Sequence, residues 1–442
     1  MSGTGRTNSA VRTDSAVPTH TAHLAPFWLL DICCRTAHGT VLFDVHMFRK
    51  PGLLFTCLLG RLLSSGAMAA PFPDFALPGP CATSKLAATI NPSPQVVSGG
   101  IPATLPVTLT LPSCSGPDTA ATLPFGPAPF PVLIFFSGFM NKASWYWRLA
   151  RQAASWGWLV LQYDISGFPS AAAELHLFPE IVQWLNDQSM DPGNLLHGQI
   201  DLGRLATAGH SRGGKIAALA YTRIRDFVST AYLIDPVDVS RFSPESADNP
   251  SAAKALAASG LAVGISAAGR TGSCNPPEGN YERFYAAAGN GTWLSVVTGA
   301  AHAQFADGGC VVNAAADLLC GRGRGVSRPT VAALTATPML AWLWQQLEGR
   351  EVEEGEPVGP SPLPTFYRWV AQQQAAGRLQ FSVKGEAEAL DWEEDAAEIA
   401  AMADMYAPAA APAAGPVPAA DLAATEDDAQ CEPVAASASQ RR

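Results

Sequence analysis

Short apolar runs alternate along the middle of the chain with longer segments in which apolar residues recur at helical spacing. Continuous β-branched and aromatic runs are typical of strands buried on both faces of a sheet. They predict strands at residues 132–136, 158–163, 205–209, 230–234, 261–265 and 292–298. The other segments predict helices at 144–156, 172–186, 212–225 and 331–347, the last of them kinked at Pro338. The alternation predicts an α/β fold with a mostly parallel central sheet and helices on both faces.

The two ends of the chain differ in composition from this middle region. Residues 1–73 are rich in Ser, Thr, Ala and Arg, and residues 351–442 are rich in Ala, Pro and Glu. We therefore predict a targeting or disordered extension at 1–73, a catalytic domain at 74–350 and a largely disordered extension at 351–442. Within that last part, residues 361–380 can form one further helix.

The negative charge belongs to the C-terminal extension. The whole chain has a formal net charge of −10, while residues 351–442 hold 17 acidic and 5 basic residues. The first 350 residues are therefore close to neutral, and no basic patch with interleaved aromatic residues occurs in them. This distribution argues against nucleic-acid binding.

Residues 47–70 have the layout of a targeting peptide. The apolar stretch at 52–63 is interrupted by Arg61 and is too short to span a bilayer, so we expect no transmembrane segment. Basic residues precede it and small residues follow it, as in a cleaved secretory signal with Met47 as its start. The Arg- and Ser-rich composition of the first 70 residues equally fits an organelle transit peptide, and both readings stay open.

The nine cysteines show neither a Cys-x-x-Cys pair nor the Cys/His spacing of a zinc site, so we expect no metal. Pairing of Cys81 with Cys114, or of Cys310 with Cys320, would fit a secretory route. Free buried thiols are the preferred interpretation.

The strongest chemical signal is the pentapeptide Gly209-His210-Ser211-Arg212-Gly213. It follows a predicted strand and opens a predicted helix, which is the context of a nucleophile elbow in an α/β-hydrolase fold. Gly209 and Gly213 provide clearance for the sharp turn. Ser211 is the predicted nucleophile, and a plain glycine-rich turn is the alternative.

A serine nucleophile requires a histidine base and an acid that orients it. His302 is the one histidine that follows Ser211 in the chain, and it comes directly after a predicted strand. Asp235 ends the strand at 230–234 and is the preferred acid, with Asp238 as the alternative. The alternative for either residue is an aspartate that only forms a turn beside the proline and has no catalytic role.

The oxyanion intermediate requires two backbone N–H donors, which we assign to Arg212 and Phe139. His210 is interpreted as structural, with its side chain directed away from the catalytic face. Arg212 and Lys215 either bind an anion at the helix start or form salt bridges on its flank. The loops at 243–257 and 267–291 are expected to form walls of the cleft.

The run from Gly209 to Lys215 resembles the lipase-type motif of chlorophyllases, and Asp235-Pro236-Val237 resembles their Asp-Pro-Val segment. Ser137-Gly138-Phe139 and the segment ending at His302 match the family's oxyanion turn and histidine region. The resemblance implies Ser211, Asp235 and His302 as the triad, and hydrolysis of the phytyl ester of chlorophyll without a cofactor. It also implies a chloroplast location, with the secretory pathway as the alternative, and peripheral membrane contact to reach the substrate.

Two other functions remain open. Residues 300–305 also look like the histidine region of platelet-activating-factor acetylhydrolases, so a general carboxylesterase or lipid esterase is the first alternative. An inert pigment- or lipid-binding protein on the same fold is the second.

Overall fold

The computed structural model describes residues 30–37, 40–47, 73–114, 123–124, 126, 128–241, 243–348 and 361–385. The chain divides into two compact units, Met1–Ala67 and Met68–Arg442. In the first unit, β1 (Leu30–Ala37) and β2 (Thr40–Met47) form an antiparallel hairpin. The hairpin lies within residues 1–73, for which we predicted a targeting or disordered extension. The apolar stretch at 52–63 lies outside the described residues, and its targeting role stays a prediction.

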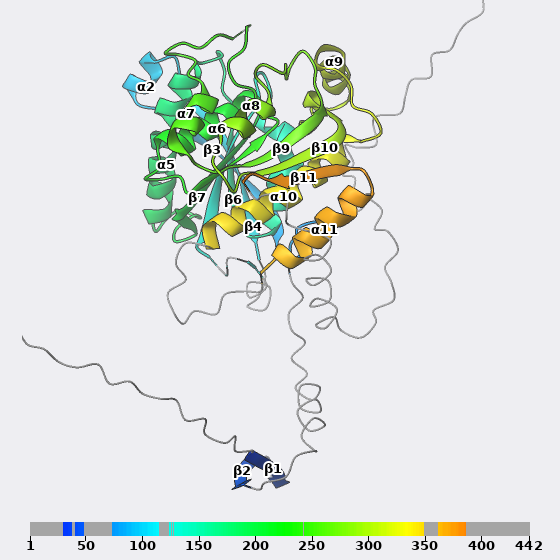
Figure 1. Cartoon of the computed structure of the whole chain (residues 1–442). Helices are drawn as coiled ribbons and strands as arrows, with labels where there is room; N and C mark the ends of the chain where they lie inside the picture. The colour runs from blue at the N-terminus through cyan, green and yellow to red at the C-terminus, as the bar shows by residue number, and fades with distance from the viewer. Residues whose placement is uncertain are drawn as a thin grey trace, which may run out of the picture. The chain divides into compact units, whose positions relative to one another are not determined.

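A nine-stranded sheet forms the centre of the second unit in its described part (Figure 1). The spatial order is β11-β10-β9-β8-β7-β5-β6-β4-β3. The strands are β3 (Ala82–Ile90), β4 (Leu105–Ser113), β5 (Phe130–Phe136), β6 (Leu159–Tyr163), β7 (Ile200–His210), β8 (Thr230–Ile234), β9 (Gly264–Arg270), β10 (Trp293–Ala301) and β11 (Leu379–Val383).

The strands from β6 through β5, β7, β8 and β9 to β10 are parallel to one another. The antiparallel pairs lie at the two edges, where β3 and β4 follow β6 and β11 follows β10. This mostly parallel sheet, with helices in its crossovers, confirms the predicted α/β-hydrolase fold. The parallel strands bring the loops that follow β5, β7, β8 and β10 to one edge of the sheet.

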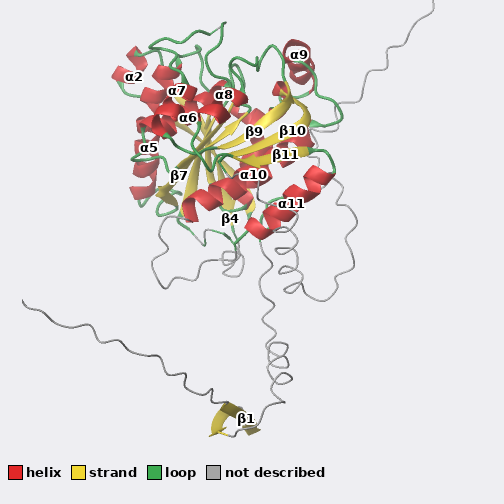
Figure 2. Cartoon of the chain, in the orientation of Figure 1, coloured by secondary structure: helices red, strands yellow, loops and turns green. Residues whose placement is uncertain are grey.

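Helices cover both faces of the sheet (Figure 2). They are α2 (Pro94–Ser98), α4 (Trp147–Ser155), α5 (Ala171–Met190), α6 (Arg212–Arg223), α7 (Ala252–Ser259), α8 (Tyr281–Ala287), α9 (Cys310–Cys320), α10 (Arg328–Glu348) and α11 (Leu363–Ala375), with 3-10 turns η1 (Ala143–Tyr146) and η2 (His302–Phe305). The helix predicted at 331–347 continues through Pro338 as α10. The strand predicted at 261–265 lies slightly later in the chain, as β9.

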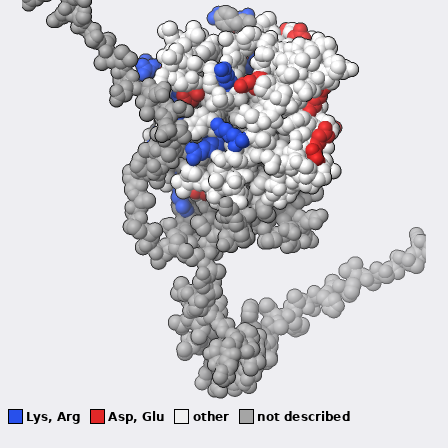
Figure 3. Space-filling model, turned by 180° about the vertical axis from the view of Figure 1, so that it is seen from behind, with Lys and Arg blue, Asp and Glu red and all other residues white. Residues whose placement is uncertain are grey.

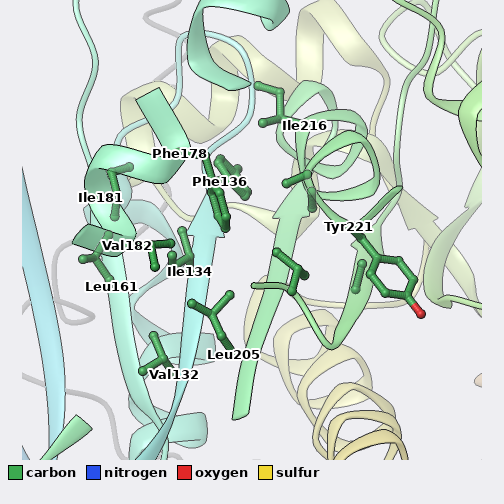
Figure 4. Packing of buried hydrophobic residues seen from close by; sticks show 14 of the residues in the cluster. Val132, Ile134, Phe136, Leu161, Phe178, Ile181, Val182, Leu205, Ile216 and Tyr221 are labelled. Atoms are coloured by element: carbon green, nitrogen blue, oxygen red, sulfur yellow. The ribbon is translucent and has the colours of Figure 1, made fainter. Parts of the chain in front are cut away.

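Alternate side chains of β5 enter two separate cores. Val132, Ile134 and Phe136 pack with α5 and α6 on one face, where Phe178 of α5 contributes to the same cluster (Figure 4). Leu133 and Phe135 pack with α4 and α10 on the other face. Burial on both faces explains why this strand is a continuous apolar run instead of an alternating one.

The domain extends past the predicted boundary at residue 350. β11 pairs antiparallel with β10, and Trp293 of β10 stacks on Phe366 of α11 with ring centroids 5.1 Å apart. The predicted end at residue 350 is therefore too early. Residues 361–385 cover the edge of the sheet at β10 and the ring of Trp293. Such long-range contacts leave no local pattern in the sequence, so the sequence did not predict them.

Between described residues, the disulfides Cys81–Cys114 and Cys274–Cys320 are present, so the preference for free thiols is wrong for these four cysteines and the alternative pairing of Cys81 with Cys114 is confirmed. The first joins the paired ends of β3 and β4, where Ala82 lies opposite Ser113 in the register. The second joins the end of α9 to the loop after β9, so Cys320 is bonded to Cys274 and not to Cys310. The correction follows from the tertiary structure, which brings distant cysteines together.

None of the described helices is long and apolar enough to cross a membrane. Figure 3 shows one face of the second unit, on which Lys, Arg, Asp and Glu side chains are few and most of the surface is uncharged. This face therefore presents no continuous basic patch of the kind that binds a nucleic-acid backbone.

Candidate active site

Ser211 lies in a strained turn between β7 and α6. Its φ and ψ are 58° and −123°, a conformation that residues with a side chain rarely adopt. A Cβ on Gly209 would lie 2.4 Å from the carbonyl carbon of Gly213, and one on Gly213 would lie 2.1 Å from the oxygen of Phe136. Both glycines are therefore needed for clearance, and the turn has the geometry expected of a nucleophile elbow.

The structure brings Ser211, His302 and Asp235 together from three different crossovers. His302 Nε2 lies 2.9 Å from Ser211 Oγ, and His302 Nδ1 lies 2.6 Å from Asp235 Oδ2. The Nδ1–H group donates to the carboxylate, which leaves Nε2 free to accept the serine hydroxyl proton. This arrangement can activate the serine as a nucleophile.

Asp235 is fully buried and is bound by several groups besides His302. Its Oδ1 accepts a 2.9 Å hydrogen bond from the backbone N–H of Ala268, and its Oδ2 accepts one of 3.1 Å from Asn275 Nδ2. These donors stabilise the charged carboxylate and hold it toward the imidazole. Asn275 was missed in the sequence because an isolated asparagine in a loop has no motif.

Asp238, the alternative acid, has another set of partners. Its Oδ2 accepts from Ser251 Oγ at 2.5 Å, and its Oδ1 accepts from the N–H of Ala252 at 2.9 Å. Lys215 Nζ and Arg283 Nε lie 3.7 and 3.4 Å from its carboxylate. Asp238 thus anchors the start of α7 and does not contact the imidazole.

The backbone N–H groups of Phe139 and Arg212 are the predicted donors of the oxyanion hole. Both residues line the pocket that contains Ser211, and within the described chain neither N–H has a hydrogen-bond acceptor. The neighbouring N–H of Gly138 is instead occupied by the hydroxyl of Tyr146 at 3.0 Å. The assignment of these two N–H groups to the oxyanion hole stays a prediction.

His210 lies inside the site, contrary to the expectation that its side chain points away. Tyr146 Oη accepts from Gly138 N–H and from Asn141 Nδ2, so its own hydrogen is donated to His210 Nδ1 at 2.9 Å. His210 Nε2 then donates to the carbonyl oxygen of His302 at 3.1 Å. Burial first, and then the neighbouring His302, lower the pKa of His210 well below its usual value, so the imidazole is neutral. The chain of contacts connects the oxyanion turn to the histidine loop.

Arg212 binds within the protein through its side chain. Its guanidinium forms an ion pair with Glu174 and donates to the carbonyl oxygen of Pro169 at 2.6 Å. Tyr163 Oη donates to the same carboxylate at 2.9 Å. Burial raises the pKa of Glu174, and Arg212 opposes that shift. Of the two roles predicted for the Arg212 side chain, the salt bridge is therefore the one that the structure shows, and binding of an external anion is not.

Lys215 is also engaged internally. Its Nζ donates to Asn249 Oδ1 at 2.6 Å and lies near the carboxylate of Asp238. Burial lowers the pKa of Lys215 to about 8, although Asp238 opposes the shift. The lysine therefore loses its charge in mildly alkaline solution.

The triad opens into a pocket of about 530 Å³ with mainly apolar walls. The loops predicted as walls contribute Asn249 and Pro276, and the helix α9 contributes Val312 and Ala316. The α9 wall was missed because a short apolar helix gives no signal of its position. No cluster of His, Cys, Asp or Glu suited to a metal occurs in the described part of the chain.

Comparison with known proteins finds similarity to a curated protein and to solved structures. The chain is 27% identical over 205 residues to chlorophyllase-2 of Arabidopsis thaliana, an alignment that covers 40% of this chain and 61% of that protein. The chain thus matches about three-fifths of the length of its curated relative. It is also similar to the solved ferulic acid esterase of Streptomyces cinnamoneus, with 22% identity, a TM-score of 0.45, and coverage of 67% of this chain and 97% of the esterase.

The family comparison covers a larger part of the chain. The family model described as chlorophyllase matches residues 117–356, which include Phe139, Ser211, Asp235 and His302. The match spans more than half of the 442 residues. The chain belongs to the chlorophyllase family.

Proposed function

We propose that this protein is a serine ester hydrolase that cleaves the phytyl ester of chlorophyll to chlorophyllide and phytol. The observation that carries the proposal is the hydrogen-bonded series Ser211, His302 and Asp235 at the mouth of an apolar pocket. Membership of the chlorophyllase family supports the choice of substrate.

In the first half of the proposed reaction, Ser211 Oγ attacks the ester carbonyl carbon while His302 Nε2 takes the hydroxyl proton. The negative charge that forms on the carbonyl oxygen is stabilised by the N–H groups of Phe139 and Arg212. The bond to the phytyl oxygen then breaks, and the imidazolium returns the proton to that oxygen. Phytol leaves, and the chlorophyllide acid remains esterified to Ser211.

In the second half, water attacks the acyl-enzyme. His302 Nε2 takes a proton from the water, and the second tetrahedral intermediate uses the same two N–H donors. The bond to Ser211 Oγ breaks, and the histidine returns the proton to the serine. The carboxylic acid of chlorophyllide is released, and the enzyme returns to its starting state.

The substrate can be tested against the first alternative, a general carboxylesterase. Purified full-length protein is incubated separately with chlorophyll and with short acyl nitrophenyl esters, and chlorophyllide is separated from chlorophyll by chromatography. Chlorophyllide formation supports the proposal. Cleavage of the short esters with chlorophyll left intact would reject the pigment and retain the ester hydrolase.

The nucleophile can be tested with Ser211→Ala. Turnover is expected to fall by about a million-fold, because triad residues act as a unit. The matched control is Ser240→Ala, since Ser240 lines the same pocket outside the triad. If Ser211→Ala still hydrolyses pigment, Ser211 is not the nucleophile. That result would not support the inert pigment-binding alternative either, because the protein would still be an enzyme.

We also propose a chloroplast location, because the proposed substrate is found there. The disulfides Cys81–Cys114 and Cys274–Cys320 favour an oxidising compartment, which makes the secretory pathway the alternative. Microscopy of the full chain with a fluorescent protein at its C-terminus, in a photosynthetic cell, distinguishes the two.

A further inference from the structure

The helix α9 is apolar on its solvent side. Its sequence is CVVNAAADLLC, and the side chains of Val311, Leu318 and Leu319 are 84%, 86% and 71% exposed. Ala314 and Ala315 are exposed on the same helix. Figure 1 shows α9 apart from the helices that cover the faces of the sheet. Several large apolar side chains exposed together on one short helix indicate a contact surface.

The other side of α9 is part of the active-site pocket. Val312, Ala316 and Cys320, spaced four residues apart, line the pocket together with Ser211. The helix is held there by the Cys274–Cys320 disulfide and by an ion pair in which Arg328 Nη2 lies 2.6 Å from Asp317. α9 is therefore a fixed wall between the pocket and the solvent.

Three more exposed apolar side chains lie at the same end of the molecule. Phe139, Met140 and Phe168 are each more than half exposed. The rings of Phe139 and Phe168 are in contact, with centroids 5.3 Å apart, and Phe139 also lines the pocket. We refer to Phe139, Met140, Phe168, Val311, Leu318 and Leu319 as the apolar rim.

The segments that carry the apolar rim are positively charged. Residues 139–142, 166–169 and 310–324 contain exposed Lys142, Arg322 and Arg324. Asp317 is the one acidic residue in these segments, and it is bound to Arg328. The first 350 residues as a whole are close to neutral, because the net charge of −10 comes from residues 351–442. Exposed cations beside apolar side chains complement a membrane with anionic headgroups.

We propose that the apolar rim docks on the surface of an anionic lipid bilayer, with α9 inserted among the headgroups and the pocket mouth facing the acyl chains. The proposal rests on the proposed function in one respect, namely that the substrate is an apolar molecule held in a membrane. Docking would let the phytyl chain pass from lipid to pocket without crossing water.

The test is co-sedimentation of the full chain with pigment-free vesicles. One set contains phosphatidylcholine alone, and the other contains equal amounts of phosphatidylcholine and phosphatidylglycerol. Wild type is expected to bind the anionic vesicles, and added salt is expected to weaken that binding. The double variant Leu318→Gln with Leu319→Gln is expected to bind about tenfold more weakly, because two leucine side chains no longer enter the lipid.

The matched control is the double variant Met190→Gln with Leu195→Gln. These two side chains are similarly exposed but precede β7, at the edge of the sheet opposite Ser211. The control is expected to bind vesicles like wild type. Both double variants are expected to hydrolyse a short water-soluble ester at the wild-type rate, which verifies that they are folded.

Equal vesicle binding by wild type and the α9 double variant would overturn the proposal. So would sedimentation equilibrium showing that wild type is a dimer and the α9 variant a monomer, because the rim would then be an interface between two copies. Vesicle binding is measured without pigment, so its failure is distinguishable from failure of the proposed chlorophyll hydrolysis.

Discussion

Backbone strain at the residue scale is concentrated around the site. Among the described residues, the non-glycine positions with positive φ are Met140, Phe168, Ser211 and Asp235. Two of these are triad members, and the other two belong to the loops at the pocket mouth. Each such conformation costs on the order of 1–3 kcal/mol and persists only where the surrounding fold enforces it. The fold thus uses packing energy to hold the site in one geometry.

The contact from Tyr146 through His210 to the carbonyl of His302 leads to a prediction on rate. Tyr146→Phe removes the hydroxyl that orders both the oxyanion turn and His210. We expect kcat to fall about tenfold with little change in KM, since the lost group stabilises geometry used in the transition state. Steady-state kinetics on a soluble ester measure both constants.

The control for Tyr146→Phe is Tyr232→Phe. Tyr232 is equally buried and its hydroxyl is bound to Ser266, outside the pocket. It is expected to lose stability without losing kcat. An equal loss of kcat in both variants would contradict a positioning role for Tyr146.

Lys215 leads to a prediction on pH. Below pH 8 the lysine is protonated in both the folded and the unfolded chain, and the cost of burying its charge is fully present. The folded lysine loses its proton near pH 8 and the unfolded one near 10.5, so the cost is relieved between these values. Wild type is therefore expected to gain stability relative to Lys215→Met as the pH rises through this window.

Thermal melts of wild type and Lys215→Met at pH 7 and pH 9.5 measure this effect. The comparison removes the contributions of groups that titrate in both proteins. A difference in melting temperature that stays constant between the two pH values would contradict the depressed pKa of Lys215.

At the element scale, the disulfide Cys81–Cys114 leads to a prediction on stability. Cys81–Cys114 joins the ends of β3 and β4 at the sheet edge, away from the triad. Removing it with Cys81→Ser and Cys114→Ser is expected to lower the free energy of unfolding by about 2–4 kcal/mol. The kcat on a soluble ester is expected to remain unchanged. Denaturant unfolding with parallel kinetics tests this, and a large loss of kcat would show that the edge strands influence the site.

At the scale of the whole molecule, the covering of β10 by α11 and β11 leads to a prediction on truncation. A chain that ends after residue 350 loses Phe366, Val370 and Leu379, all buried, and exposes Trp293. It is expected to be about 3–5 kcal/mol less stable than a chain that ends after residue 385. Equal stability of the two chains in denaturant unfolding would show that these contacts contribute nothing.

The sequence by itself determined the parts of this protein that depend on local patterns. Continuous apolar runs predicted β5, β6, β7 and β8, because burial on both faces demands them. The strand-to-helix context of Ser211 predicted the elbow, because only small residues fit beside it. The chain order of Ser211, Asp235 and His302 selected three residues that the structure then placed within hydrogen-bond distance.

Only the tertiary structure decided the features that depend on residues far apart in the chain. His210 reaches the carbonyl of His302, Asn275 reaches Asp235, and β11 pairs with β10. The choice between Asp235 and Asp238, three residues apart, depended on which carboxylate the fold aims at the imidazole. The place of α9 at the pocket mouth likewise follows from packing and from the bond between Cys274 and Cys320. Such contacts are made by backbone geometry over many residues, and a local pattern of apolar and polar positions does not encode them.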